Sequence, residues 1–447
     1  MSRGETVRRA LPAVAARSGP FSWAQLEITN GYREDLALPP ETRPNFDLHA
    51  TLHLRGRWRL PIDDLLRALT RVAARHECFR TTVHDLAEPR PAQRVNPAET
   101  FPIVVGEVRS DGGADVLAKE FGREMIDVGG RHLVRIGVTG DRGTGENVVI
   151  AASRLLVDGW GFSNLARDVM REIGTGGHGA EPPAVFHQLD QVAWEEGPAG
   201  RARTAAAIAH REQVADRLRA AAIVPRTRLS PDLGQEARCE GAAVTRLCDR
   251  IATRLSTSPS TVLLAAFCHT VARRLDQRAV GVTLSYADRG DARRQSSVTR
   301  LKSEATMLYT DGTEPDTVFR DTFAAALTAY TRAGVDPFAL RRAGVSDGLL
   351  RAQNVRFEFN DARGQFHRND RSSGTPRAAH PPPERRPDPR VRTVLDGKPP
   401  RLGLWVGPSF SDFAGKTSLT VRTNILTKEE TAAVLRGILD VLWEAAA

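Results

Sequence analysis

The sequence predicts an α+β fold, an α-β sandwich arranged as two lobes. Its 447 residues exceed the roughly 250 to 300 residues that one hydrophobic core supports, so two lobes are expected. Short apolar runs of strand length alternate with longer segments of helical period in both halves. The content of 41% apolar and 26% charged residues is ordinary for a soluble protein, and no run approaches the roughly 18 apolar residues of a membrane span. We therefore expect a soluble protein without a membrane partner.

The N-terminal segment predicts cytoplasmic residence. Its apolar residues are interrupted by Arg8, Arg9 and Pro12, which leaves no hydrophobic region fit for a secretory signal. The cysteines share no metal-ligand spacing and lie inside apolar patterns, which predicts buried free thiols and no metal site. They are Cys78, Cys239, Cys248 and Cys268.

The charge balance favours an acidic partner. A net charge of +9 suits nucleic acid or an acidic protein such as a carrier protein. The basic residues are scattered, however, and no basic stripe interleaved with aromatics occurs. We therefore do not expect nucleic-acid binding.

Elements of the first half follow from their patterns. Alternating apolar and polar residues predict a half-buried strand from Phe46 to His53. After Pro61, apolar residues recur at steps of three and four and predict a helix with one buried face. A further helix is expected at Ala114 to Phe121, and a strand at His132 to Thr139.

The stretch from Asn147 to Phe162 organises the chain. Its apolar, β-branched run from Val148 to Ala152 is too short for a core helix and predicts a buried central strand. Ser153 and Arg154 follow where the strand ends, and Asp158-Gly159 marks a turn into a helix. The preceding strand is expected to pair with this one through a hairpin loop at Gly140 to Gly145.

The second half is predicted in the same way. Residues 185–221 are rich in alanine and arginine and predict long helices that connect the lobes, and a buried helix with Ser258 or Ser260 as its cap is expected from Ser258 to Leu275. Thr427 and Glu430 form a capping box for the last helix. Residues 361–400 are rich in proline and arginine and predict an insert outside either core. Strands are expected at Val280–Tyr286, Val355–Asn360, Arg401–Val406 and Ser418–Thr423.

Ser153 to Gly159 resembles the His-His-x-x-x-Asp-Gly motif of nonribosomal peptide synthetase condensation domains, members of the chloramphenicol acetyltransferase-like superfamily. Other segments resemble that family in the same order along the chain. They are Ser22–Gln25, Arg75–Thr81, Asp288–Gly290, Pro337–Phe338 and Val355–Asn360.

The resemblance implies two acyltransferase-like lobes that form a V-shaped pseudo-dimer around a central tunnel. We expect a flexible N-terminus at residues 1–18, one lobe at 19–180 and the other at 181–447. It also implies that no cofactor is bound and that substrates arrive on the phosphopantetheine of an acyl or peptidyl carrier protein.

Both motif histidines are absent, which changes the expected chemistry. Arg154 stands at the position of the second histidine and cannot take a proton near neutral pH, so its catalytic role would be that of a fixed positive charge. Ser153 would act as a nucleophile only beside a base, and no Ser-His-Asp pattern can be assembled from the sequence.

The remaining site residues are expected to be structural or to line the tunnel. By resemblance, Asp158 and Gly159 hold the loop, with Asp158 ion-paired to a basic residue, for which Arg289 is the candidate. Trp160 and Tyr286 are candidates for the tunnel wall, although packing is the favoured interpretation of Trp160. His76, in the Arg-His-Glu segment, is expected to end a helix rather than catalyse.

Two functions stay open. The first is a free-standing condensation-type acyltransferase that forms an amide or ester bond from a carrier-bound thioester in natural-product biosynthesis. The second is a non-catalytic relative, like the X domain of glycopeptide synthetases, that binds carrier proteins or recruits tailoring enzymes. The lost histidines favour the second, and the absence of a fused carrier or adenylation domain favours the first, to which we commit as the prediction.

Overall fold

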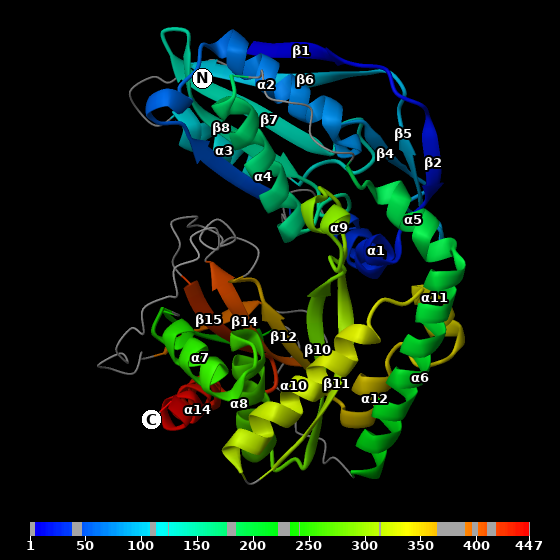
Figure 1. The fold of residues 1–447 in the computed structure, drawn as a ribbon, viewed down its shortest axis with the longest axis vertical. Helices are drawn as coiled ribbons and strands as arrows, with labels where there is room; N and C mark the ends of the chain where they lie inside the picture. Colours follow the sequence, from blue (N-terminus) through cyan, green and yellow to red (C-terminus); the bar gives the residue numbers. More distant parts are fainter. Residues whose placement is uncertain are drawn as a thin grey trace. The chain divides into compact units, whose positions relative to one another are not determined.

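In the computed structural model the chain divides into two compact units (Figure 1). One comprises Met1–Arg201 and Ala287–Lys302, and the other comprises Ala202–Tyr286 and Ser303–Ala447. The structure describes residues 5–37, 47–107, 113–123, 125–176, 185–221, 233–240, 242–312, 314–363, 389–395, 401–408 and 417–446.

The first unit is built on a five-stranded mixed sheet of order β1-β6-β7-β8-β3. Only the β6–β7 pair is parallel. A second sheet of order β2-β5-β4 is antiparallel. The strands are β1 (Glu5–Leu11), β2 (Arg17–Pro20), β3 (Leu48–His53), β4 (Thr81–His84), β5 (Ala92–Val95), β6 (Glu99–Glu107), β7 (Val134–Asp141) and β8 (Thr144–Ala152).

Helices α2 and α4 pack on one another and against the larger sheet, and α3 packs against β3, β7 and β8 (Figure 1). The apolar face predicted after Pro61 is buried along α2. Short 3-10 turns lie at Gly56–Trp58 and Glu77–Phe79. The helices of this unit are α1 (Trp23–Leu36), α2 (Ile62–Arg75), α3 (Gly113–Arg123), α4 (Gly159–Gly174), α5 (Gln188–Glu196) and α9 (Ala292–Ser296).

Strand β8 confirms the prediction of a buried central strand, because each residue from Val148 to Ala152 is 0% exposed. It pairs with β7 on one side and β3 on the other, so its apolar side chains meet the core on both faces. The hairpin turn is tighter than predicted, with only Arg142 and Gly143 between the strands. Both have positive φ, 48° and 81°, which suits a two-residue turn between twisted strands.

The second unit is built on a seven-stranded sheet of order β11-β10-β12-β14-β15-β9-β13. Pairs β10–β12 and β12–β14 are parallel, and β14–β15, β15–β9 and β9–β13 are antiparallel. The strands are β9 (Leu233–Glu240), β10 (Ala279–Ala287), β11 (Lys302–Thr310), β12 (Arg356–Asp361), β13 (Arg390–Leu395), β14 (Arg401–Pro408) and β15 (Thr417–Thr423).

Helices α7, α8, α10 and α14 pack together, and their apolar side chains share one core with the sheet. Of the two serines expected to cap α8, Ser258 is the cap, because its Oγ accepts from the Thr261 N–H. The Thr427–Glu430 capping box is also present, with reciprocal distances of 2.9 and 3.2 Å. The helices are α6 (Pro198–Ala220), α7 (Ala242–Leu255), α8 (Pro259–Arg274), α10 (Pro315–Thr331), α11 (Pro337–Arg342), α12 (Gly348–Gln353) and α14 (Lys428–Ala446).

The N-terminal prediction was wrong over most of residues 1–18. Glu5–Leu11 forms β1, which pairs along its full length with β6, and Arg17 begins β2. Of β1 only Leu11 is fully buried, because an edge strand needs few apolar side chains. The arginines that interrupt the apolar pattern therefore do not prevent strand formation.

The predicted division at residue 180 also needs correction. The first unit extends through α5 to Arg201, and Ala287–Lys302 packs on it although that segment lies in the second half of the sequence. Arg294 accounts for part of this packing, since its guanidinium lies 5.2 Å from the Phe186 ring centroid and 4.7 Å from that of Trp194. The connecting helices predicted at 185–221 are present as α5 and α6.

The predicted insert, residues 361–400, is wrong at both ends. Asp361 ends β12 and forms a bidentate ion pair with Arg363, whose Nε donates to Oδ1 and whose Nη2 donates to Oδ2. Arg390–Leu395 forms β13, paired in register with β9. Residues 364–388 and 396–400 lie outside the described residues.

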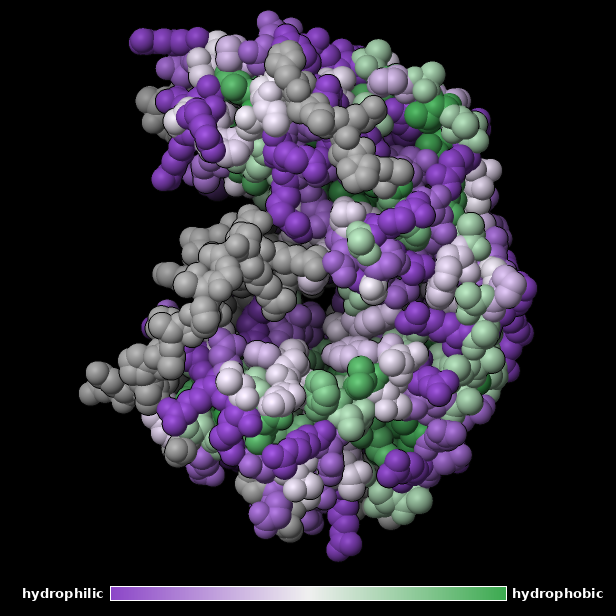
Figure 2. Space-filling model, in the orientation of Figure 1, coloured by the Kyte–Doolittle hydropathy of each residue, from purple (hydrophilic) through white to green (hydrophobic). Residues whose placement is uncertain are grey.

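The four cysteines are free and buried, as predicted. Burial raises the pKa of Cys78 to about 12, so this thiol stays protonated at neutral pH. Hydrophilic residues cover much of the face seen in Figure 2, and hydrophobic ones appear there in small separate areas. Among the described helices, none is both long and apolar enough to cross a bilayer.

Candidate functional site

The loop that follows β8 is a buried turn. Ser153 donates its N–H to the Leu133 carbonyl, and its own carbonyl accepts from the Leu156 and Val157 N–H groups. Leu155 and Val157 are 0% exposed. The loop is therefore held by the core beneath it as well as by its backbone.

Asp158 joins this loop to residues 287–302. Its Oδ1 accepts from the Gly161 N–H at 2.7 Å and from Arg289 Nη2 at 2.9 Å. Its Oδ2 accepts from the Leu301 N–H at 2.8 Å. Burial alone raises the pKa of Asp158, but Arg289 and these two N–H groups outweigh it and hold the pKa below its ordinary value. The predicted Asp158–Arg289 ion pair is therefore present, and Asp158 also caps α4.

Arg289 extends the network to the backbone. Its Nη1 donates to the Arg294 and Ser297 carbonyls at 2.7 and 3.0 Å, and its Nη2 donates to the Thr299 carbonyl at 3.0 Å. The Arg289 side chain is only 4% exposed, so the pair is desolvated as well as hydrogen-bonded. One buried guanidinium thus fixes the course of this segment.

The start of α4 lies very close to the same segment. A Cβ on Gly161 would lie 2.5 Å from the Thr299 carbonyl oxygen, which is too close. The backbones can approach in this way only because glycine has no Cβ. Gly159 opens the helix directly after its Asp158 cap. The Asp-Gly pair of the motif and nearby Gly161 therefore make a tight, structural junction.

Arg154 is the charged residue of the loop. Its carbonyl accepts from Arg300 Nη1 at 3.2 Å, and its side chain is half-buried. Burial lowers the pKa of Arg154, while the nearby Tyr32 and Asp47 raise it. An arginine remains a cation at neutral pH under such shifts, so the site holds a largely desolvated positive charge.

Ser153 does not have the surroundings of a nucleophile. It is 0% exposed, and its Oγ lies 3.3 Å from the Tyr32 hydroxyl and accepts from the Leu155 N–H. Within the described chain, no imidazole or carboxylate makes a hydrogen bond to this hydroxyl. The hypothesis of a Ser153 nucleophile is therefore unsupported by this geometry.

Sequence reasoning missed Asp47 and Tyr32. Asp47 is 6% exposed and directly precedes Leu48, which pairs with Ala152 at the end of β8. Its Oδ2 accepts from the Ile126 N–H. Burial raises the pKa of Asp47 to about 6, opposed by that hydrogen bond and by Arg135 and Arg154. The only sequence signal was a carboxylate at the start of a strand expected to be half-buried.

The two tunnel candidates lie in different units. Trp160 is in the first turn of α4, and its Nε1 donates to the Gln295 carbonyl at 3.3 Å. Tyr286, in β10, accepts from Arg203 Nη2 at 2.7 Å and stacks on Tyr330 with ring centroids 5.9 Å apart. Both side chains therefore have packing roles, and a shared tunnel wall stays a prediction.

His76 is structural, as expected. It follows the last residue of α2, is 2% exposed, and its Nε2 lies 2.7 Å from Asp168 Oδ2 on α4. Burial lowers the pKa of His76, although Asp168 opposes this shift. The contact links the two helices that pack on the sheet.

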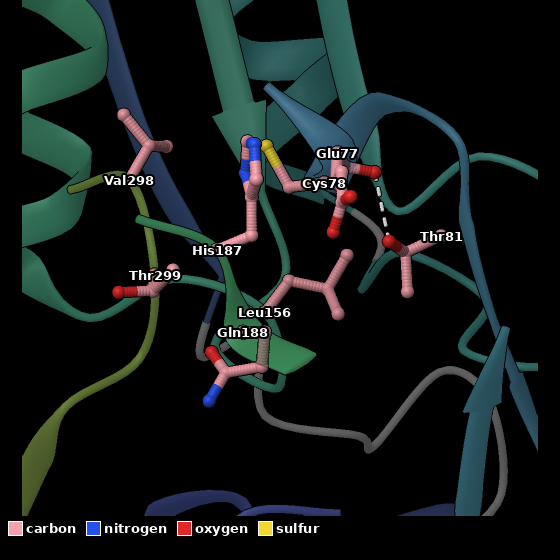
Figure 3. A pocket seen from close by; sticks show the side chains of 8 residues that line it. All are labelled: Glu77, Cys78, Thr81, Leu156, His187, Gln188, Val298 and Thr299. Carbon is pink, nitrogen blue, oxygen red and sulfur yellow. Dashed lines mark hydrogen bonds between the residues drawn. The ribbon is translucent and has the colours of Figure 1, made fainter. Parts of the chain in front are cut away.

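A small cavity lies beside the motif loop within the first unit (Figure 3). Its volume of about 10 Å³ suits a single water molecule and not a substrate. In Figure 3 the His187 ring points toward Cys78, and burial lowers the pKa of His187 to about 4, so this ring is neutral at pH 7. The lining residues are Glu77, Cys78, Thr81, Leu156, His187, Gln188, Val298 and Thr299.

No group of three His, Cys, Asp or Glu side chains within the described ranges could hold a metal ion. The loop carries a half-buried cation, Arg154, whose charge is coupled to Tyr32 and Asp47, and burial raises the pKa of both of these groups.

Comparison with known proteins relates this architecture to solved structures. No protein-family model matches the sequence, and no curated protein matches it significantly. The condensation domain of the enacyloxin polyketide synthase is 19% identical with a TM-score of 0.70, covering 98% of this chain and 83% of that one. The PapA2 acyl transferase is 13% identical with a TM-score of 0.67, covering 99% and 97%.

The X-domain from teicoplanin biosynthesis is also similar, at 18% identity and a TM-score of 0.63, covering 98% of this chain and 97% of that one. These likenesses extend over both units. The chain therefore has the fold that condensation domains, an X-domain and an acyl transferase share.

Proposed function

We propose that this protein transfers an acyl group from the phosphopantetheine thioester of a carrier protein to an amine or hydroxyl acceptor in natural-product biosynthesis. A thioester is already activated, so bringing the acceptor into line can accelerate its attack substantially. The site would then need to stabilise the negative charge that develops on the thioester oxygen.

The observation that carries this proposal is the positive charge of the half-buried Arg154 side chain at the end of β8. Burial of a guanidinium is costly, and its lowered pKa reflects that cost. A charge held under such conditions at the end of a central strand is typical of a functional site. As a fixed cation, Arg154 is suited to stabilise an oxyanion and unsuited to remove a proton.

The acceptor nitrogen or oxygen would form the new acyl bond while the phosphopantetheine sulfur leaves as a thiolate, and the proton of the acceptor would pass to that thiolate or to solvent. Asp158 is engaged by Arg289 and two backbone N–H groups, so it supports the loop and has no proton-transfer task. No bound cofactor is required by this chemistry.

The second candidate is a binding protein without catalysis, which recognises a carrier-bound intermediate or recruits other enzymes. The burial of Ser153 and the neutral partners of its hydroxyl favour this function. The two candidates predict different outcomes when the protein meets a loaded carrier.

The deciding experiment uses carrier proteins encoded beside the gene, each loaded with an acyl thioester, and a panel of amines and alcohols. Intact-protein mass spectrometry then follows loss of the acyl mass from the carrier. Acyl loss that requires both this protein and an acceptor supports transferase function.

Arg154→Ala should then lose roughly 10²- to 10³-fold in rate, the usual effect of removing an oxyanion donor. Arg142→Ala is the matched control, because Arg142 lies in the β7–β8 turn with its side chain 93% exposed. If no acceptor removes the acyl group while the carrier still binds, the binding function takes its place.

A further inference from the structure

Three elements bring charged and hydroxyl groups together around Arg154. Tyr32 comes from α1, Asp47 precedes β3, and Arg154 follows β8. The register of β3 on β8, with Leu48 opposite Ala152, places Asp47 beside the start of the loop. Tyr32 reaches the same loop through its hydroxyl, 3.3 Å from Ser153 Oγ.

Electrostatic coupling within this cluster runs in both directions. The charge of Asp47 raises the pKa of Arg154, and the charge of Arg154 lowers the pKa of Asp47. The described groups that act on Asp47 are the Ile126 N–H, Arg135 on β7 and Arg154. Burial dominates them, and the pKa of Asp47 lies near 6.

We propose that Asp47 is the positioning residue of Arg154: its carboxylate keeps the guanidinium at the end of β8 and thereby controls the proposed acyl-transfer site. This inference rests on the proposed function only where it predicts a change in the rate of acyl transfer. The coupling between the charges of Asp47 and Arg154 can be tested by stability measurements, without an activity assay.

The proposal makes Asp47 a residue that costs stability at neutral pH. A buried carboxyl whose folded pKa is raised stabilises the protein fully below its unfolded pKa, near 3.9, and that stabilisation is lost as pH rises through 6. A carboxylate kept under such conditions is typical of function rather than of packing.

The first measurement is the melting temperature of Asp47→Asn and the parent from pH 4 to pH 8. Asparagine keeps an oxygen that can accept from the Ile126 N–H but has no proton to lose. The variant should lack the fall in melting temperature that the parent shows as pH rises through about 6. A variant that keeps the parent's pH dependence of the melting temperature overturns the proposal.

Asp127→Asn is the control, because Asp127 is exposed on the adjacent loop, where its Oδ1 accepts from the Gly129 N–H. It removes the same charge without the burial. Its melting curve should keep the pH dependence of the parent.

A second variant tests the coupling even if Asp47→Asn does not fold. Arg154→Met removes the cation and leaves Asp47 intact, so the pKa of Asp47 should rise further above 6. The midpoint of the stability change with pH should therefore move upward. An unmoved midpoint overturns the proposal.

The rate of acyl transfer gives the functional readout. The rate of the parent should fall as pH drops through about 6, where Asp47 becomes protonated. Asp47→Asn should show no such fall, and its rate should be lower by up to roughly 100-fold. A parent-like rate and pH profile in Asp47→Asn contradicts the positioning role. If no variant transfers an acyl group but the melting results hold, the proposed function fails while the coupling of Asp47 to Arg154 stands.

Discussion

Asp158 and Arg289 are 131 residues apart in sequence and form a buried ion pair at 2.9 Å. Arg289 belongs to the segment that returns from the second half of the chain to the first unit. The pair therefore holds together two stretches that no local interaction would join.

Removal of one partner should be strongly destabilising. Asp158→Ala leaves Arg289 buried without its carboxylate, which costs about 3 to 5 kcal/mol in the free energy of unfolding. Chemical denaturation measures this directly. Asp141→Ala is the control, because that side chain is 58% exposed, and it should stay within about 0.5 kcal/mol of the parent. An unchanged stability in Asp158→Ala, with activity lost, would make Asp158 catalytic.

The same pair should govern stability in acid. The pKa of Asp158 is lowered in the folded state, so its stabilisation is present above the unfolded pKa near 3.9 and is lost as pH falls through the folded pKa. The difference in stability between parent and Asp158→Asn should therefore shrink below about pH 4. Melting temperatures from pH 3 to pH 7 test this, and a constant difference would contradict it.

Gly161 should tolerate no side chain. In Gly161→Ala the new Cβ would meet the Thr299 carbonyl oxygen at 2.5 Å, so α4 or residues 297–301 must shift. Overpacking of this kind costs typically about 1 to 3 kcal/mol. Gly290→Ala is the matched control, since nothing lies within 4 Å of its Cβ position. Equal melting temperatures for the two variants would disprove the close approach.

Arg154→His restores a histidine to the motif and should alter the pH profile. In the parent, the rate should follow the deprotonation of the acceptor amine and of Asp47, because Arg154 does not titrate near neutrality. Histidine ordinarily titrates near 6.5, and burial at this position would lower its pKa, so a new inflection is expected below that value. Arg142→His, at an exposed turn, should add none. If neither variant shows an inflection that the parent lacks, a proton-transfer role for a histidine at position 154 is excluded.

The proline- and arginine-rich insert should be removable up to β13. Deletion of residues 371–388 removes little apolar area, so the melting temperature should be unchanged. Deletion of residues 371–395 also removes β13, whose Val391 packs on the core, and should lower it. Loss of folded protein after the shorter deletion would contradict the prediction.

The local sequence determined the elements that carry the motif. The apolar run of β8, the Asp158 cap of α4, the Ser258 cap and the Thr427–Glu430 box are each encoded within a few residues. Periodicity and capping are short-range effects, so one sequence is enough to predict them. The Asp158–Arg289 pair also came from the sequence, through resemblance rather than from any periodicity.

Only the tertiary structure decided what surrounds Arg154. Strand register places Asp47 beside the loop, and packing buries Ser153 and gives it Tyr32 as a neighbour. The tertiary structure also decided that Glu5–Leu11 forms an edge strand and that Ala287–Lys302 belongs to the first unit. Burial and pairing between distant segments set these positions and the resulting pKa values, and both depend on the whole fold and not on neighbouring residues.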